Sequence, residues 1–247
     1  MLLLEHDPEP VEDINGSSKS PIFLLSEHAG RCVPLALGDL GVSERELDPH
    51  RFVDVGAEAL ARCIADLLGA PLVMQRYSRL VIDCNRPPGT IESVPQIVDG
   101  VPIPGNQKGL TENRDQEIFF PLDGAIQEGL KKHKRKAAFS IHSFTPRLLR
   151  GPLRPWHCGF ISRLDIKTAE HLRNSVLNAA PELEVAVNQP YQIDDETDWF
   201  IPNYAEPQEM LHSLIEVRND QLMTKEGIDR WAELLANAIK TLPELQQ

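Results

Sequence analysis

Residues 138–144 read AFSIHSF, an apolar run typical of a β-strand, with His142 close to its end. Two other runs have the same form: PIFLL at 21–25 shortly precedes His28, and SLIEVR contains Glu216. In open α/β sheets, ligands bind beyond the carboxyl ends of the strands, so we expect these polar groups to converge there. Two histidines that converge with carboxylates indicate a metal-assisted hydrolase.

Apolar, strand-like runs alternate with helical patterns over most of the chain. Residue Gly69 ends the first helical pattern, and Asp165 and Thr224 are suitable N-caps for the last two. The alternation predicts a layered α/β domain with a mainly parallel sheet. The expected strands cover residues 21–26, 71–76, 79–83, 137–142, 157–161, 183–187 and 213–217. The expected helices cover residues 53–68, 111–132, 165–179 and 224–240.

The length of 247 residues and the 41% apolar content suit one globular domain. We expect residues 1–20, which are acidic and contain serine and glycine, to form a loosely ordered lead before a single catalytic domain at 21–247. The stretch 86–109 is rich in proline and glycine and follows an expected strand directly. It is therefore expected to be a long irregular loop, and it could cover the site.

The charge balance excludes some partners. With 25 Lys+Arg against 37 Asp+Glu, the net charge of −12 argues against nucleic-acid binding. The first residues, MLLLEHDPEP, lack the pattern of a signal peptide, and no apolar run is long enough to span a membrane. The four cysteines have no CxxC spacing and are expected to be reduced thiols. These features predict a cytoplasmic protein with a small-molecule partner.

His142 and Glu216 are the strongest candidates for chemistry. An imidazole inside AFSIHSF would be largely buried, so it needs hydrogen-bond partners or a metal. A carboxylate inside SLIEVR is costly to bury without a compensating group, and the structural alternative is a salt bridge with Arg218 or Arg79. His28 alone is weaker evidence, because a single histidine in a turn is more often a surface or capping residue.

The stretch YSRLVIDCNRP supplies cationic groups. Arg79 and Arg86 bracket an expected strand, and Asn85 stands beside Arg86 at its end. A guanidinium at this place is well shaped to bind a carboxylate with two hydrogen bonds. The alternative is that Arg79 or Arg86 pairs with Asp83 inside the fold.

Taken together, seven motifs give the chain a resemblance to a known family. In order they are EHAGRCVP, DPHRFVDVGA, YSRLVIDCNRP, SIHSFTP, WHCGFIS, NQPY and IEVRND. The set resembles the N-formylglutamate amidohydrolase family over about residues 21–235. The resemblance implies an α/β three-layer sandwich of the phosphorylase/hydrolase-like type, with a mixed, mostly parallel central sheet similar to that of zinc carboxypeptidases. It also implies cleavage of N-formyl-L-glutamate to formate and L-glutamate, as in histidine breakdown.

The resemblance also implies roles for individual residues. It makes His28, Asp54 and His142 the ligands of one Zn²⁺ per chain, with Glu216 as the general base. Glu27 is an alternative third ligand because it adjoins His28, and His50 is a weaker substitute. Arg79 would help to hold the developing oxyanion and would contact the substrate. The remaining substrate contacts implied are Asn85 and Arg86, which would bind the α-carboxylate, together with Ser143 and Asn188.

Two other functions remain open at this stage. The first is an amidase or carboxypeptidase-like hydrolase of other N-acyl amino acids or small peptides, which would use the same metal and base. The second is a non-catalytic protein that binds a small molecule. Tyr204 marks a departure, because many relatives have a histidine before the last strand. His and carboxylate ligands also accept Mn²⁺, Co²⁺ or Fe²⁺, so the sequence does not fix the metal.

Overall fold

The central feature of the fold is a sheet of seven strands, in the order β1-β3-β2-β6-β9-β7-β8. The computed structural model describes residues 1–42, 49–107, 111–148, 151–194 and 196–246. β2 pairs in parallel with β3 and β6, β6 with β9, and β7 with β8, whereas β1 and β7 run antiparallel to β3 and β9. This mixed, mostly parallel sheet confirms the predicted fold class. The strands are β1 (Val11–Ile14), β2 (Ile22–Ser26), β3 (Leu72–Gln75), β6 (Ala137–Phe144), β7 (Cys158–Ile161), β8 (Val185–Val187) and β9 (Leu211–Arg218).

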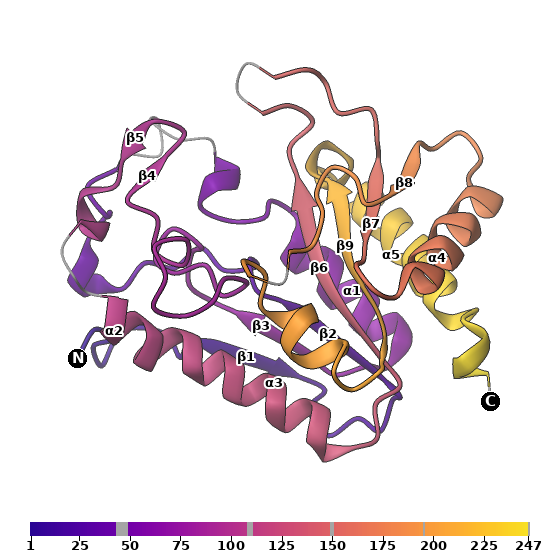
Figure 1. Ribbon diagram of the computed structural model, residues 1–247, viewed down its shortest axis with the longest axis horizontal. Coiled ribbons are helices and arrows are strands. Elements are labelled where there is room, and N and C mark those ends of the chain that lie inside the picture. Colours follow the sequence, from indigo (N-terminus) through magenta and orange to yellow (C-terminus); the bar gives the residue numbers. More distant parts are fainter. Residues whose placement is uncertain (43–48, 108–110, 149–150, 195, 247) are drawn as a thin grey trace.

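Helices cover both faces of the sheet and give three layers (Figure 1). Three helices, α1 (Ala57–Leu68), α4 (Ile166–Ala179) and α5 (Lys225–Lys240), pack in one core with alternate strand residues. On the other face, α3 (Phe120–Lys132) packs in a second core, against the strand residues that alternate with those of the first core. In the described part of the chain, no helix combines the length and apolar composition needed to cross a membrane.

The helix ends follow the predicted capping residues. The Asp165 side chain accepts a hydrogen bond from Thr168 N (3.1 Å) at the start of α4. Thr224 Oγ1 accepts one from Gly227 N (3.1 Å) at the start of α5. Gly69 ends α1 with a left-handed φ of 56°, a conformation that glycine adopts without steric cost. The expected helix at 111–132 is one helical stretch composed of α2 (Thr111–Arg114), a π-helical turn (Asp115–Phe119) and α3.

The expected strand at 79–83 is wrong, because this segment turns instead of pairing. Its apolar side chains are buried in the second core, which explains the strand-like composition. Side chains, and not a neighbouring strand, satisfy two of its carbonyl groups. Asn106 Nδ2 donates to Leu80 O (2.9 Å) and Arg114 Nη1 donates to Val81 O (2.7 Å). An apolar run alone does not distinguish a buried turn from a strand.

Two other segments differ from their expected loose structure. Residues 11–14, in the expected lead, form the edge strand β1, which pairs with β3 over its full length. The stretch 86–109 contains a short two-stranded sheet, β4 (Ile97–Val98) and β5 (Val101–Pro102). A 3₁₀ turn at Pro104–Asn106 follows these two strands. The described part of 86–109 is therefore not wholly irregular.

Candidate functional site

The carboxyl ends of β6, β9 and β2 bring the predicted polar side chains together. His142 on β6 and Glu216 on β9 are partners in the strand register. Because side chains alternate along a strand, both lie on the sheet face covered by α3, as Leu214 does. His28 follows β2, and the Asp54 backbone N–H donates to the His28 carbonyl (2.9 Å). This backbone contact holds the turn before α1 against the end of β2.

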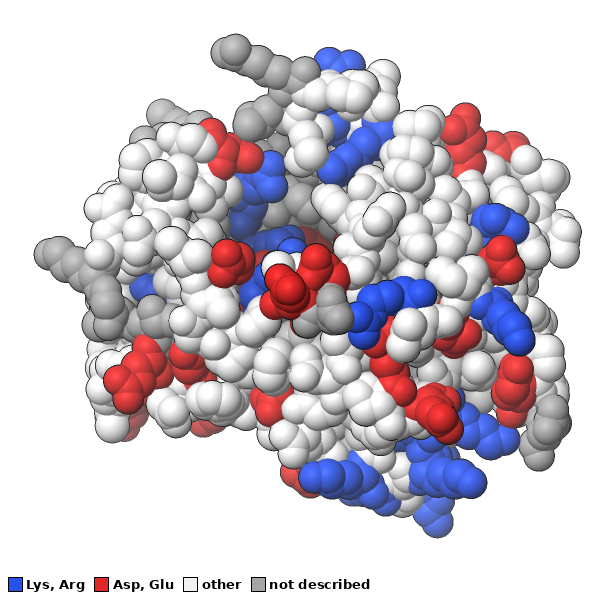
Figure 2. Space-filling model, viewed as in Figure 1, with Lys and Arg blue, Asp and Glu red and all other residues white. Residues whose placement is uncertain are grey.

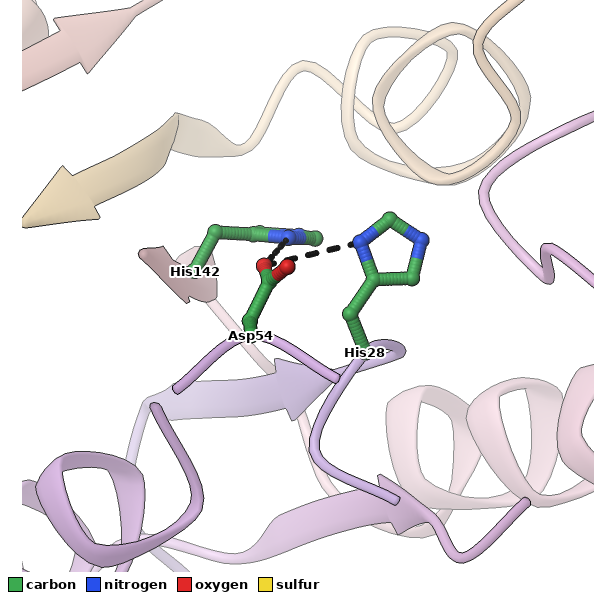
Figure 3. A group of neighbouring side chains, drawn as sticks. All are labelled: His28, Asp54 and His142. Carbon is green, nitrogen blue, oxygen red and sulfur yellow. Dashed lines mark hydrogen bonds and ion pairs between the residues drawn. The ribbon is translucent and has the colours of Figure 1, made fainter. Parts of the chain in front are cut away.

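His28, Asp54 and His142 form a buried cluster in which Asp54 lies between the two imidazoles (Figure 3). Asp54 Oδ2 is 2.9 Å from His142 Nδ1 and 3.5 Å from His28 Nδ1. His28 Nδ1 is buried and forms no hydrogen bond with the described residues. One ligand atom from each residue lies within 4.8 Å of the others. Two imidazoles and one carboxylate are the ligand set of many catalytic zinc sites, so these residues fit a metal ion.

The outer nitrogen of each histidine faces a second carboxylate. His28 Nε2 lies 2.7 Å from Asp83 Oδ1, and His142 Nε2 lies 3.1 Å from Glu27 Oε2. Ser140 Oγ contacts both Glu27 and His142. Carboxylates in this position fix the orientation of metal-binding imidazoles. Glu27 thus contacts His142 on the side opposite Asp54. His50, the other alternative ligand, lies with its Nε2 3.6 Å from Asp54 Oδ1.

Asp83 is a residue of this network that the sequence analysis did not assign to the site. Arg79 Nη2 donates to Asp83 Oδ2 (2.9 Å), and Arg79 Nη1 donates to Asp54 Oδ1 (3.1 Å). Burial alone would raise the pKa of Asp83, but His28 and Arg79 outweigh it and lower that pKa. The carboxylate is therefore ionised at neutral pH. The alternative pairing of Arg79 with Asp83 is present, and it lies inside the site.

Glu216 Oε2 is buried and, like Glu27 Oε1, forms no hydrogen bond with the described residues. The alternative salt bridges for Glu216 are not formed, since Arg218 pairs with Asp220 and Arg79 with Asp54 and Asp83. Burial, the largest cause, raises the pKa of Glu216 to about 7. A poorly solvated carboxylate of this kind can accept and release a proton near neutral pH.

Gly159 lies opposite Glu216 in the register of β7 and β9. A Cβ atom at Gly159 would lie 1.7 Å from the Gln189 carbonyl oxygen. Only glycine therefore lets the main chain at Gln189 approach the strand this closely. This approach places the segment that contains Tyr191 beside Glu216, at the wall of a cavity.

The cavity has a volume of about 350 Å³ and opens beyond the strand ends. Figure 2 shows a hollow on the same face as Figure 1, with basic and acidic side chains gathered in it and at its rim. Asp54 is buried and does not line the cavity itself, but it contacts Arg79, which does. Of the segment 86–109, only Arg86 is among the described lining residues. The predicted residues that line the cavity are His28, His50, Arg79, Asn85, Arg86, His142, Ser143 and Glu216.

Asn85 and Arg86 line the cavity, but both also contact Asp198. Arg86 Nη1 and Asn85 Nδ2 donate to Asp198 Oδ1 at 3.0 and 3.1 Å. Asn85 Oδ1 accepts from the backbone N–H groups of Trp199 (3.2 Å) and Phe200 (3.3 Å). Asn85 and Arg86 therefore hold the segment around Asp198 at the cavity. Sequence reasoning missed Asp198 because it stands in a polar loop with no distinctive pattern.

Three other residues have contacts that the sequence did not indicate. Asn188 does not line the cavity, and its Oδ1 accepts from Ser162 N (2.9 Å). Ser143 lines the cavity, but its Oγ donates to Val55 O (2.8 Å). Tyr204 lies against α3, where its hydroxyl donates to the Asp123 carboxylate. Of these three, only Ser143 reaches the cavity.

Comparison with known proteins gives the family. Residues 20–223 match the family model described as N-formylglutamate amidohydrolase. The chain belongs to the N-formylglutamate amidohydrolase family. This match covers most of the chain and includes all of the residues that form the cluster and the cavity wall. Membership in this family, together with the cluster, supports a hydrolase with a plausible metal site.

Solved structures are similar to the chain over nearly its whole length. Gene product Atu2144 from Agrobacterium tumefaciens is 30% identical, with 100% of both chains covered and a TM-score of 0.92. An N-formylglutamate amidohydrolase from Ralstonia eutropha JMP134 is 17% identical, with 94% and 96% covered and a TM-score of 0.70. YNDL in its zinc-free apo form is 12% identical, with 96% and 93% covered and a TM-score of 0.50. The last two similarities concern the fold alone. No curated protein matches the sequence.

Proposed function

We propose that the protein is a zinc-dependent amidohydrolase that cleaves N-formyl-L-glutamate to formate and L-glutamate. The observation that carries this proposal is the position of Asp54 between His28 and His142, with Glu216 facing the same end of the sheet from β9. Family membership supports the reaction and the substrate. We place the enzyme in the cytoplasm, where reduced cysteines are normal.

His28, Asp54 and His142 would hold the zinc ion. When bound, zinc in such a site polarises a carbonyl group and lowers the pKa of water. Asp83 and Glu27 keep the two imidazoles in the orientation that directs Nδ1 toward Asp54. We therefore propose Asp54, and not Glu27, as the carboxylate ligand, because Glu27 faces the outer nitrogen of His142.

Glu216 is the proposed general base. Its unpartnered Oε2 takes a proton from the attacking water and then delivers it to the departing amine nitrogen. Arg79 lines the cavity, and its positive charge stabilises the negative charge that develops on the carbonyl oxygen. Arg86 and Asn85 hold the α-carboxylate of the substrate and so position the amide bond.

Elemental analysis combined with an assay of formate release tests this function. Purified protein is expected to contain about one zinc per chain and to release formate from N-formyl-L-glutamate until a chelator removes the metal. Zinc without formate release would favour an amidase for other N-acyl amino acids or small peptides. Protein that takes up no metal even after reconstitution would favour the non-catalytic binding protein and contradict the proposal.

A further inference from the structure

Among the described residues, three arginines line the cavity, and each already has an acidic partner. Arg79 pairs with Asp54 and Asp83, and Arg86 pairs with Asp198. Arg51 pairs with Asp99 through two short contacts. A guanidinium with a carboxylate partner gains less from a second carboxylate, because part of its charge is neutralised and its donors are used. A substrate with two carboxylates therefore needs another cation.

Arg154 provides such a cation beside Tyr191, which is one of the residues that line the cavity. Its guanidinium carbon lies 5.6 Å from the centroid of the Phe144 ring and 5.1 Å from that of the Tyr191 ring. Arg154 Nη1 donates to Thr145 O and to the Tyr191 hydroxyl, both at 3.2 Å. Within the described ranges, no acidic side chain forms an ion pair with Arg154. The two rings thus hold a guanidinium that keeps its full charge.

The position of Arg154 suits a group that extends from the proposed reaction centre. Phe144 follows His142 by two residues on β6, so both side chains lie on the same face. Two residues along a strand span roughly 6.6 Å, which is about the distance from the formyl carbon of an extended N-formylglutamate to its side-chain carboxylate. Tyr191, which contacts Arg154, lines the same cavity as Glu216. Arg154 therefore lies next to a residue of the cavity wall, within reach of a substrate side chain that extends past Tyr191.

We infer that Arg154, together with the Tyr191 hydroxyl, binds the side-chain carboxylate of an N-acyl dicarboxylic amino acid. This inference rests on the proposed function and makes it more specific, because it assigns the second carboxylate of the substrate. Arg86 and Asn85 hold the α-carboxylate at one wall, and Arg154 holds the side-chain carboxylate at another. Because the two rings fix the guanidinium in advance, little side-chain entropy is lost on binding.

Substitution Arg154→Gln, assayed on a matched pair of substrates, tests the inference. N-formyl-L-glutamine replaces the side-chain carboxylate of N-formyl-L-glutamate by an amide of almost the same shape. The variant is expected to lower kcat/KM for the glutamate substrate roughly tenfold or more, mainly through KM, and to leave the glutamine substrate almost unchanged. Tyr191→Phe, which keeps the ring, should give a smaller loss of the same kind. An equal fall for both substrates would overturn the assignment.

Arg173→Gln is the matched control. Arg173 lies on α4, and its guanidinium contacts Asn174 beside it. This variant changes the net charge as Arg154→Gln does and should leave both kcat/KM values unchanged. A loss of discrimination in Arg173→Gln would mean that the general charge of the protein, and not Arg154, selects the substrate.

Calorimetric binding of glutarate and butyrate separates this inference from the proposed function. Glutarate has two carboxylates and butyrate has one, and neither contains an amide that can be cleaved. If the protein hydrolyses no N-acyl amino acid, the proposed function fails, but binding still tests Arg154. Glutarate should bind roughly tenfold more weakly to Arg154→Gln than to the wild type, with butyrate unchanged. Equal glutarate binding, or no binding to the wild type, would overturn the inference.

Discussion

Individual carboxylates of similar burial have different environments at this site. Asp54 lies between two imidazoles, and Glu27 and Asp83 face the outer nitrogens of these same rings. Glu27 and Glu216 each have one buried oxygen without a hydrogen bond from the described residues, but burial raises the pKa of Glu216, whereas His142 helps to lower that of Glu27 against its burial. The sequence indicated Glu216 because a charge inside an apolar strand is unusual. It did not indicate Asp83, because this residue follows the apolar run of segment 79–83, where a polar side chain is ordinary.

Glu216→Gln should separate metal binding from turnover. Glutamine has nearly the same size but accepts no proton at neutral pH, so we expect normal zinc content and a loss of roughly 100-fold or more in kcat. Glu170→Gln, at an exposed position on α4, is the control and should keep full activity. Zinc analysis and formate release measure the two effects. Undiminished turnover in Glu216→Gln would exclude this residue as the base.

Asp54→Asn and Glu27→Gln should differ in their effect on zinc affinity. If Asp54 is a ligand, its amide variant should lose stoichiometric zinc. Glu27→Gln leaves the ligand set intact and disturbs only the orientation of His142, so affinity should fall about 10- to 100-fold. Competition with a chromogenic chelator measures both values. The reverse order of effects would make Glu27 the ligand.

At the scale of elements, the sequence predicted the strands and helices that have a regular apolar pattern. The register of β6 and β9 explains why His142 and Glu216 could be brought together from sequence alone. β1 was missed because VEDI is short and half polar, and only its pairing with β3 makes it a strand. Tyr191 and Asp198 lie in connections whose path depends on packing, so no periodicity identifies them.

Arg114, in the helical stretch before α3, should stabilise the connection that contains Asn85 and Arg86. Its buried guanidinium donates to the carbonyls of Val81 (2.7 Å) and Gly105 (2.8 Å) and to Asn106 Oδ1 (2.7 Å). Burial lowers the pKa of Arg114 to about 10, so it is still charged at neutral pH.

Arg114→Leu leaves these acceptors buried without donors and should reduce the free energy of unfolding by about 3 kcal/mol. Urea denaturation measures the change, and Lys131→Ala, at an exposed position in the last turn of α3, is the control. An unchanged unfolding midpoint for Arg114→Leu would mean that other contacts hold this connection.

At the scale of the whole molecule, the site joins segments that are far apart in sequence and collects excess negative charge. The buried or partly buried ionisable groups around the cluster are Glu27, Asp54, Asp83 and Glu216 on the acidic side and His28, His142 and Arg79 on the basic side. A divalent cation would offset this excess and link the ends of β2 and β6 to the turn before α1. Metal binding should therefore stabilise the entire fold.

Unfolding with and without zinc tests this linkage. A ligand that binds only the folded state adds about 2.7 kcal/mol when its free concentration is 100 times its dissociation constant. The wild type should gain about this amount, and Asp54→Asn should gain much less. Thermal or urea unfolding in zinc buffers gives both values. An equal gain in the two proteins would mean that zinc binds elsewhere.

Gly159 determines which part of the cavity can change in a relative or in an engineered enzyme. At this position the strand beside Glu216 meets the main chain of Gln189, and the spacing between them is set by the absence of a Cβ atom. Main chain cannot be exchanged for another chemical group, and any larger residue would force the wall outward. New substrate preferences therefore have to come from the side chains that line the space, such as Leu148 and Ile193. For directed evolution, these side chains are the adjustable part, and Gly159 on the strand beside the carboxylate is the fixed part.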